Sequence, residues 1–375
     1  MSGSRPITGV AAAELAARRR LPKTLFERVR AGAGQDITNQ ENIAAFREVT
    51  FRPRVATPTA DRDLTVSVLG SRLRLPVILA PTGGIRMVHP DGELGAARAA
   101  GAAGTACAIS MFSGFPLEEI AAAATGPLYQ QIYLTFGREH AESTIARASA
   151  AGYDALVLTV DVPVLPHRPD DRPLRADLPN ALRYGPELLT RPGWLYRFVR
   201  DGMPFDAANA VKADERAQSA TMTVSWQDLA WIRELWPRAI VVKGIVGAED
   251  AVRAVEAGAD AIVVSNHGGK GLDGAPATIR VLPRIVKAVG GSVEILLDGG
   301  VRTGADVVRA IALGAGAVLI GRAYIWGLAV GGECGVREIL DTFEFEIDRT
   351  LGLLGCGAIA ELDETFVEIR GADRT

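Results

Sequence analysis

Four segments of the chain repeat one pattern, in which a glycine ends a predicted helix and an apolar strand follows: 99–110, 150–160, 256–265 and 312–321. Glycine after the last helical residue relieves left-handed backbone strain, so each copy marks a junction from helix to strand. Apolar segments typical of buried strands occur eight times, and amphipathic helical patterns separate nearly all of them. These segments are 76–80, 105–110, 129–134, 155–160, 240–243, 261–264, 295–297 and 317–320.

Eight β-α units in one chain predict an α/β fold of the (β/α)8 TIM barrel type. An open doubly wound sheet is the alternative, and it is disfavoured because no GxGxxG turn follows the first strand. With 375 residues, 48% of them hydrophobic, the chain can form one large domain, 1–375. We expect a leader, 1–70, with a helix over about 11–29, a lid-like insertion after the fourth strand, 162–226, and a closing helix, 336–356.

The overall charge and the cysteines restrict the classes of function. A net charge of -3 gives no electrostatic reason to expect nucleic acid or an anionic membrane as a partner. The three cysteines are scattered without CxxC spacing, which is typical of a reducing compartment, so we expect a cytoplasmic protein without a metal site. The N-terminus has no signal-peptide pattern, and Arg322 interrupts the most apolar window, 312–332, so we expect no membrane span.

The stretch 261–279, AIVVSNHGGKGLDGAPATI, carries the most chemical information. Its apolar start is typical of a strand buried on both faces, and the polar residues Ser265 and His267 follow just before two glycines. Glycines let the backbone approach a ligand closely, so this pattern places the imidazole of His267 at the rim of a site. Taken alone, the stretch could equally be a capped strand end with a structural histidine.

Polar residues or glycines end nearly every predicted strand. In TIM barrels the catalytic groups lie at the C-terminal ends of the strands. The residues at those ends are Pro81, Thr82, Gly83, Ser110, Gln131, Tyr133, Thr159, Asp161, Lys243, Ser265, His267, Asp298, Gly299, Gly300, Gly321 and Arg322. Because these ends meet at one mouth of the barrel, we expect the side chains to form one site.

The last two strand ends predict a phosphate site. Phosphates in these barrels bind to the loops after the seventh and eighth strands, next to free backbone N–H groups. Gly299 and Gly300 with Arg302, and Gly321 with Arg322, supply glycines for close approach and guanidinium groups that match a phosphate. Arginines paired with carboxylates at the rim are the alternative.

The centre of the mouth would be lined by the amide of Gln131, the hydroxyls of Thr159 and Ser110, and the ammonium of Lys243. Such groups suit a heterocycle with carbonyl and ring-nitrogen edges, such as a flavin, and a cation could stabilise negative charge on the reduced ring. Lys243 taken alone could instead be the Schiff-base lysine of an aldolase.

Together these residues resemble the FMN-dependent 2-hydroxy-acid oxidase and dehydrogenase family, which includes glycolate oxidases and flavin lactate dehydrogenases. The resemblance spans about 21–356 and rests on SNHGGKGLDGAPATI, LDGGVRTGADV, ALGAGAVLIGR, LAPTGG followed by HPDGE, and LTVD. It implies that His267 removes a proton from the substrate, that Asp161 stabilises the imidazolium and that Tyr133 hydrogen-bonds the substrate. The implied FMN contacts are Pro81, Thr82, Gly83, Ser110, Gln131, Thr159, Lys243, Ser265, Asp298, Gly299, Gly300, Arg302, Gly321 and Arg322.

Three positions depart from the family pattern. Members that oxidise small hydroxy acids hold the substrate carboxylate with two arginines and a tyrosine, and the matching positions here are Lys270, Val164 and Arg28. Lys270 keeps a charge but loses the guanidinium fork, and Val164 keeps neither. We therefore expect these positions to face the substrate without holding a small carboxylate in the family's manner.

These departures and the sequence LTRPGWLYRFV in the insertion resemble a subgroup typified by the pre-mycofactocin synthase. That resemblance implies oxidation of a carbon bearing an amine in a larger, peptide-derived molecule. We thus predict an FMN-dependent oxidoreductase that removes a hydride equivalent from a carbon bearing OH or NH2, with a small L-2-hydroxy-acid oxidase or dehydrogenase as the alternative. The family resemblance also implies a homo-oligomer, a tetramer, and electron transfer to O2 or another carrier.

Overall fold

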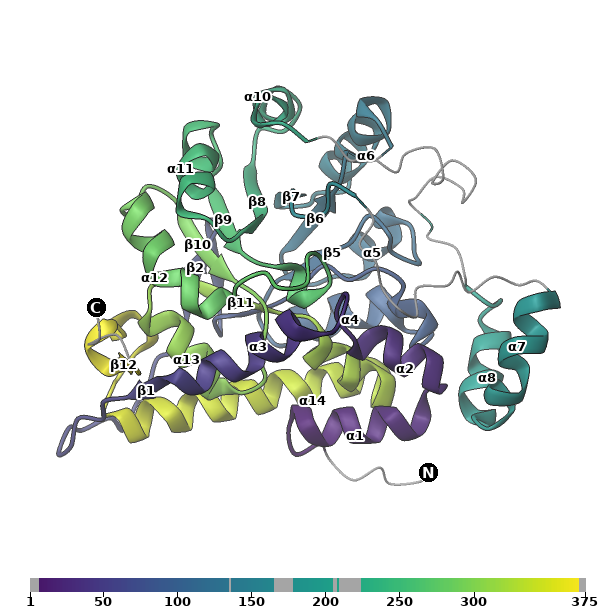
Figure 1. Ribbon diagram of the computed structural model, residues 1–375, viewed down its shortest axis with the longest axis horizontal. Helices are drawn as coiled ribbons and strands as arrows, with labels where there is room; N and C mark the ends of the chain where they lie inside the picture. The colour runs from purple at the N-terminus through teal and green to yellow at the C-terminus, as the bar shows by residue number, and fades with distance from the viewer. Residues whose placement is uncertain (1–6, 135, 165–177, 205–207, 209–223, 371–375) are drawn as a thin grey trace.

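The fold is a closed barrel of eight parallel strands, surrounded by helices (Figure 1). The computed structural model describes residues 7–134, 136–164, 178–204, 208 and 224–370. The strands are β4 (Val77–Leu79), β5 (Cys107–Ile109), β6 (Leu128–Ile132), β7 (Ala155–Thr159), β8 (Ala239–Ile245), β9 (Ala261–Val264), β10 (Glu294–Leu297) and β11 (Ala317–Ile320). Each overlaps one predicted segment, and β11 pairs with β4 to close the ring, so the predicted TIM barrel is confirmed.

Apolar side chains fill both the inside of the barrel and the layer between strands and helices. Within β4, Ile78 belongs to the inner cluster, whereas Val77 and Leu79 belong to the outer one. This alternation follows from the two-residue period of a strand, and it explains why the strand sequences are apolar throughout. The outer helices are α4 (Gly92–Ala102), α5 (Leu117–Ala123), α6 (Arg138–Ala150), α10 (Trp226–Leu235), α11 (Ala248–Glu256), α12 (Thr278–Val289), α13 (Gly304–Ala312) and α14 (Arg322–Leu354).

The leader differs from the single helix that the sequence predicts. Its helical part divides into α1 (Val10–Arg20) and α2 (Lys23–Arg30) at Pro22, because proline lacks the N–H that would continue α1. Next come α3 (Ile37–Ala45), the short helix η1 (Phe46–Glu48) and β1 (Val49–Phe51), which pairs with β12 (Val367–Ile369). The leader ends in a hairpin of β2 (Val66–Val68) and β3 (Ser71–Leu73).

The insertion between β7 and β8 contains α7 (Leu178–Leu189) and α8 (Pro192–Arg200), which lie to one side of the barrel (Figure 1). Three contacts fasten this pair. Asp201 forms a bidentate ion pair with Arg86, the Trp194 indole N–H donates to the carbonyl of Met87, and Glu187 accepts from Thr24 of the leader. Much of the predicted insertion, including 165–177 and 209–223, lies outside the described residues, and its function as a lid stays a prediction.

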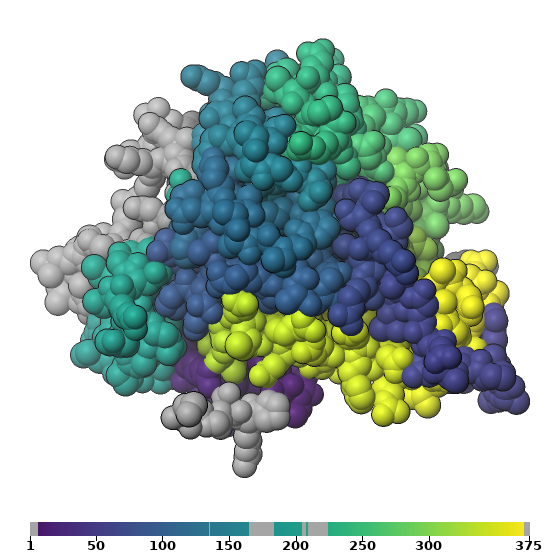
Figure 2. Space-filling model, turned by 180° about the vertical axis from the view of Figure 1, so that it is seen from behind, coloured from purple at the N-terminus to yellow at the C-terminus, as the bar shows by residue number. Residues whose placement is uncertain are grey.

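The predicted closing helix is the second part of α14, which bends at Gly332. Gly332 has a φ of +61°, and a Cβ there would lie 2.2 Å from Asp91 Oδ2, so only glycine fits the bend. In Figure 2, α14 runs along the base of the molecule, and it contacts both α1 and α4. The apolar window 312–332 divides between β11 and the start of α14. Within the described ranges, no helix has both the length and the apolar character to cross a membrane.

Glu93, in the first turn of α4, is a buried carboxyl group. Its Oε1 accepts a hydrogen bond from the Gly114 N–H at 3.1 Å, whereas Oε2 has no partner among the described residues. Burial removes the carboxylate from water and raises the pKa of Glu93 to about 7. Since this pKa lies above its value in the unfolded chain, ionisation of Glu93 destabilises the fold as the pH rises.

We expect Glu93→Gln to stabilise the protein at about pH 8 and to have a smaller effect at about pH 5. The contribution of the protonated carboxyl is complete below its unfolded-state pKa of 4.5, and it is lost as the pH rises through the folded pKa of about 7. Glutamine does not ionise, so the difference in free energy of unfolding between Glu93→Gln and the wild type should grow by on the order of 2 kcal/mol from about pH 5 to about pH 8. Urea denaturation of both proteins at the two pH values measures this difference. An equal difference at the two pH values would contradict the assigned titration.

Candidate active site

A cavity of about 420 Å3 opens at the C-terminal ends of the strands, where the sequence predicts the site. Its wall includes segments after β4, β5, β6, β7, β9, β10 and β11 and Lys243 of β8 itself, and it is completed by α2 of the leader. The predicted residues that line it are Arg28, Pro81, Thr82, Gly83, Ser110, Tyr133, Lys243, His267, Lys270, Asp298, Gly299, Gly300, Arg302, Gly321 and Arg322. The strand-end pattern therefore brings most of its members to one place.

Five predicted residues do not line the cavity, and four of these directly support it. Gln131 accepts hydrogen bonds from the Ser110 hydroxyl and the Met111 N–H, at 3.3 and 3.2 Å. The Ser265 hydroxyl lies 2.9 Å from the Lys243 ammonium, and Thr159 is the register partner of Lys243 on β7. The fourth is Asp161, which contacts His267.

Val164 is the fifth, and the structure separates it from the site. Its side chain is 57% exposed and is not part of the cavity wall. The apolar residue that replaces the family's second arginine therefore contributes no group to the cavity.

His267 and Asp161 form a hydrogen-bonded pair at the mouth of the barrel, with 3.0 Å between Nδ1 and Oδ1. Burial pushes the pKa of Asp161 upwards, but the adjacent His267 and Lys243 more than offset it, so the pKa lies below its usual value. An ionised Asp161 favours the proton on Nδ1, which leaves the lone pair of Nε2 available as a proton acceptor. The pair thus has the arrangement of a general base held by a carboxylate.

Lys243 is buried beside two acidic groups. Its ammonium forms an ion pair with Asp298 at 2.9 Å and donates to the Ser265 hydroxyl. Burial lowers the pKa of Lys243, but Asp298 and Asp161 raise it by more, so the pKa lies above its usual value and the side chain stays charged. A Schiff-base lysine must lose its proton before it can attack a carbonyl group. The aldolase alternative is therefore disfavoured.

Buried polar atoms without a protein partner cluster around this mouth. Among the described residues, they include Gln131 Nε2, Thr159 Oγ1, Asp161 Oδ2 and Asp298 Oδ1. Buried polar groups are normally hydrogen-bonded, so a bound polar group would complete this set of donors and acceptors. Amide, hydroxyl and carboxylate groups in this arrangement fit the edge of a heterocycle. No group of His, Cys, Asp and Glu in the described part of the chain is arranged to hold a metal ion.

The loops after β10 and β11 place glycines beside partly buried guanidinium groups. Gly299 and Gly300 have φ values of +91° and +87°. Burial lowers the pKa of both Arg302 and Arg322, that of Arg322 to about 9. Neither arginine pairs with a carboxylate in the described ranges, so the alternative of rim ion pairs is not what the structure contains. Two partly buried cations beside glycines that line the cavity fit a phosphate.

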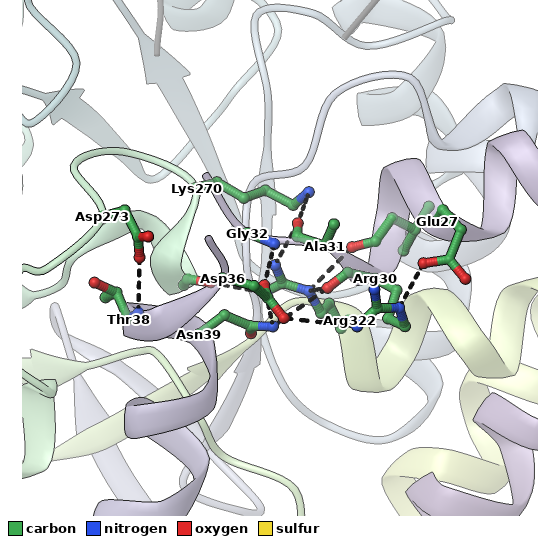
Figure 3. A network of polar contacts seen from close by, with 12 residues as sticks. Glu27, Arg30, Ala31, Gly32, Asp36, Thr38, Asn39, Lys270, Asp273 and Arg322 are labelled. Atoms are coloured by element: carbon green, nitrogen blue, oxygen red, sulfur yellow. Dashed lines mark hydrogen bonds and ion pairs between the residues drawn. The ribbon is translucent and has the colours of Figure 1, made fainter. Parts of the chain in front are cut away.

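Arg322 and Lys270 contact backbone carbonyls of the leader (Figure 3). Arg322 donates to the carbonyls of Val29, Arg30, Ala31 and Gly268. Lys270 donates to the carbonyls of Arg28 and Ala31, each at 2.8 Å. The C-terminal end of α2 thus supplies partial negative charge to both side chains.

Two residues that support His267 were not predicted from the sequence. Asn42 of α3 and Asn266 exchange two side-chain hydrogen bonds, both at 2.8 Å. The position of Asn266 within SNHGG could have identified it as a supporting residue. The sequence around Asn42 contains no pattern that would identify Asn42. Arg86, which lines the cavity and pairs with Asp201, was also missed, since its partner lies 115 positions away.

Comparison with known proteins gives four consistent matches. Residues 17–369 match the family described as FMN-dependent dehydrogenase. The chain is 43% identical to the pre-mycofactocin synthase of Mycobacterium tuberculosis, over 94% of this chain and 92% of that protein. It is 41% identical to an L-lactate oxidase of Nostoc, over 95% and 96% of the two chains. A crystal structure of (S)-mandelate dehydrogenase, described as a monotopic membrane protein, covers 97% of this chain and 100% of that one at 36% identity and a TM-score of 0.92.

Gly300→Ala and Gly274→Ala form a matched pair that tests the glycine loop. The two residues share one backbone conformation, with φ values of +87° at Gly300 and +88° at Gly274. A Cβ at Gly300 would lie 2.1 Å from the Asn42 carbonyl oxygen, whereas a Cβ at Gly274 would have no atom within 4 Å. Gly274→Ala should cost about 1 kcal/mol through backbone strain alone. Gly300→Ala should cost about 1–3 kcal/mol more, because backbone atoms must move. Equal denaturation midpoints for the two variants would contradict the close packing.

Proposed function

The chain belongs to the FMN-dependent dehydrogenase family, and from this premise we propose that it oxidises a carbon bearing OH or NH2 with His267 as the base. It is an FMN-dependent oxidoreductase of the hydroxy-acid oxidase type. The observation that carries the proposal is the His267–Asp161 pair, 3.0 Å apart at the mouth of a cavity that also contains the charged Lys243. A base and a buried cation facing one cavity are what this reaction requires.

We propose that the residues around the cavity hold FMN in two parts. Arg302, Arg322 and the backbone of Gly299 and Gly300 would bind the phosphate, since they line the cavity and supply positive charge and backbone N–H groups. The flavin ring would lie against the other strand ends. Its proposed contacts there are Pro81, Thr82, Gly83, Ser110, Gln131, Thr159, Lys243, Ser265, Asp298 and Gly321. When bound, FMN supplies the acceptor for two electrons and a hydrogen from the substrate.

The chain's own residues then handle the proton. His267 Nε2 accepts the proton of the substrate hydroxyl or amine while the substrate carbon gives up its hydrogen with the bonding electrons. The product is a carbonyl compound or an imine. Asp161 stabilises the imidazolium that forms and holds the ring in one tautomer. Lys243 keeps a positive charge at the wall of the same cavity, where it would stabilise negative charge that develops on bound FMN. Tyr133 lines the same cavity and would orient the substrate by a hydrogen bond.

The substrate we propose is larger than lactate or carries no carboxylate. Lys270 already donates to two backbone carbonyls, and Val164 is exposed away from the cavity. Apolar residues on the wall, including Leu25, Val29 and Phe112, offer contact area to a larger molecule. Similarity to a protein named pre-mycofactocin synthase supports a peptide-derived substrate oxidised at an amine-bearing carbon.

A small L-2-hydroxy-acid oxidase is the second candidate function, and the 41% identity to an L-lactate oxidase favours it. Arg28 lines the cavity from α2 and would be the guanidinium that holds a carboxylate in that case. Electron transfer to O2 is also proposed, with support from the same relative, and another carrier is the alternative. A homo-oligomeric, cytoplasmic enzyme remains part of the proposal.

We expect L-lactate and glycolate to reduce the bound FMN slowly. An unpaired carboxylate in the cavity loses hydration without regaining two bidentate contacts. Anaerobic mixing with L-lactate, glycolate, (S)-mandelate and a larger aryl amino-ketone, followed by flavin bleaching, measures the order of rates. The variant Lys270→Arg, which restores one guanidinium fork at a residue that lines the cavity, should speed the reaction with L-lactate. Rapid bleaching of the wild type by L-lactate or glycolate would instead support the small-acid oxidase.

His267→Ala should keep FMN but slow its reduction by about 10²–10⁴-fold, because the base acts in the transition state. Asp161→Asn should slow it by a smaller factor, since the imidazole remains. Single-turnover bleaching by the fastest compound of that panel gives both rates, and the absorbance of the purified variants gives FMN content. A near-normal rate in His267→Ala would assign proton transfer to another residue.

A further inference from the structure

We propose that Asn42, a leader residue outside the cavity wall, is a positioning residue that holds the loop after β9 so that the His267 imidazole meets Asp161. The inference rests on the proposed role of His267 as base. It deepens that role by assigning part of the site to the leader. Asn42 and its partner Asn266 are 224 positions apart along the chain.

The loop that carries His267 has an unfavourable backbone conformation. His267, Gly268 and Gly269 have φ values of +60°, +59° and +76°. Glycine adopts this left-handed region readily, but histidine has a Cβ that clashes with the backbone there. A non-glycine residue keeps such a conformation only where surrounding contacts enforce it. His267 must therefore be held by its neighbours.

The side-chain amide of Asn266 is one such neighbour, and it connects the segment to the leader. Its Oδ1 accepts from the Gly269 N–H at 3.2 Å and from Asn42 Nδ2 at 2.8 Å. Its Nδ2 donates to Asn42 Oδ1 at 2.8 Å and to the Pro276 carbonyl at 2.9 Å. An amide group has two donor hydrogens and two acceptor lone pairs, so every hydrogen-bonding position of Asn266 is used. Half of them depend on Asn42.

Asn42 also contacts the glycine loop proposed to bind the phosphate. Only 1% of its surface is exposed, and its Oδ1 additionally accepts from the Thr278 N–H at 3.3 Å. Its backbone carbonyl lies against Gly300, at the point where a Cβ would come within 2.1 Å. One residue of α3 thus fixes the base loop and the glycine loop relative to each other.

Asn39 provides a matched control on the same helix. It is buried to a similar degree, with 6% of its surface exposed, and it lies one turn from Asn42. Its side chain donates to the Arg30 carbonyl and to Asp36 Oδ1, both in the leader (Figure 3). Removal of this side chain weakens the leader without removing a side-chain hydrogen bond to the His267 loop.

The test uses the proton on His267 Nδ1, which a hydrogen bond to a carboxylate moves to low field in a ¹H NMR spectrum. Holoenzyme loaded with FMN, without substrate, should show a low-field resonance that His267→Gln abolishes. Asn42→Ala should move this resonance upfield or broaden it beyond detection. Asn42→Asp, which keeps the acceptor oxygens but loses the donor to Asn266, should also shift it, and it serves if Asn42→Ala does not fold. Asn39→Ala should leave the resonance in place even where it lowers the melting temperature.

The outcomes separate this inference from the proposed function. A wild-type spectrum without a resonance that depends on His267 would contradict the His267–Asp161 geometry and the proposed function with it. A resonance that is present but unchanged in both Asn42 variants would overturn this inference alone. An equal shift in Asn39→Ala would also overturn it, because the effect would then follow from general weakening of the leader.

Discussion

The hydrogen bonds between the leader and the loop after β9 are the interactions on which the candidate active site depends. The Gly269 carbonyl accepts from the Ala33 N–H at 2.7 Å, and the Asp273 carboxylate accepts from the Thr38 N–H at 2.9 Å. With the Asn42–Asn266 amide pair, these bonds hold a loop that contains a left-handed histidine. The barrel strands place the base near the mouth, but the leader sets its orientation. The leader is therefore a structural part of the site.

The second constraint is the balance of buried charge at the mouth. Lys243 is neutralised by Asp298, and Asp161 is paired with His267. Arg302 and Arg322 have no carboxylate partner in the described part of the chain, and burial makes their charged forms costly. Backbone carbonyls of α2 stabilise Arg322 in part. A phosphate would complete this balance, which connects the chemistry of the site with the family to which the chain belongs.

The sequence predicted what depends on local signals. Glycine stops and apolar runs located the eight strands, and polar strand ends located the cavity residues, because parallel strands bring those ends together. The sequence did not show that Lys270 contacts the leader backbone, that Arg86 pairs with Asp201, or that Asn42 supports Asn266. Each of these contacts joins residues that are far apart along the chain. Their side chains are common in unrelated settings, so no local pattern distinguishes them.

We propose above all that Arg302 and Arg322, the partly buried arginines of the mouth, bind the phosphate of FMN. Titration of the flavin-free protein with FMN and with riboflavin, which lacks the phosphate, tests it most directly. Charge-assisted hydrogen bonds from two guanidinium groups should make FMN bind on the order of 100-fold more tightly than riboflavin, or more. Equal affinity for the two flavins would contradict the account.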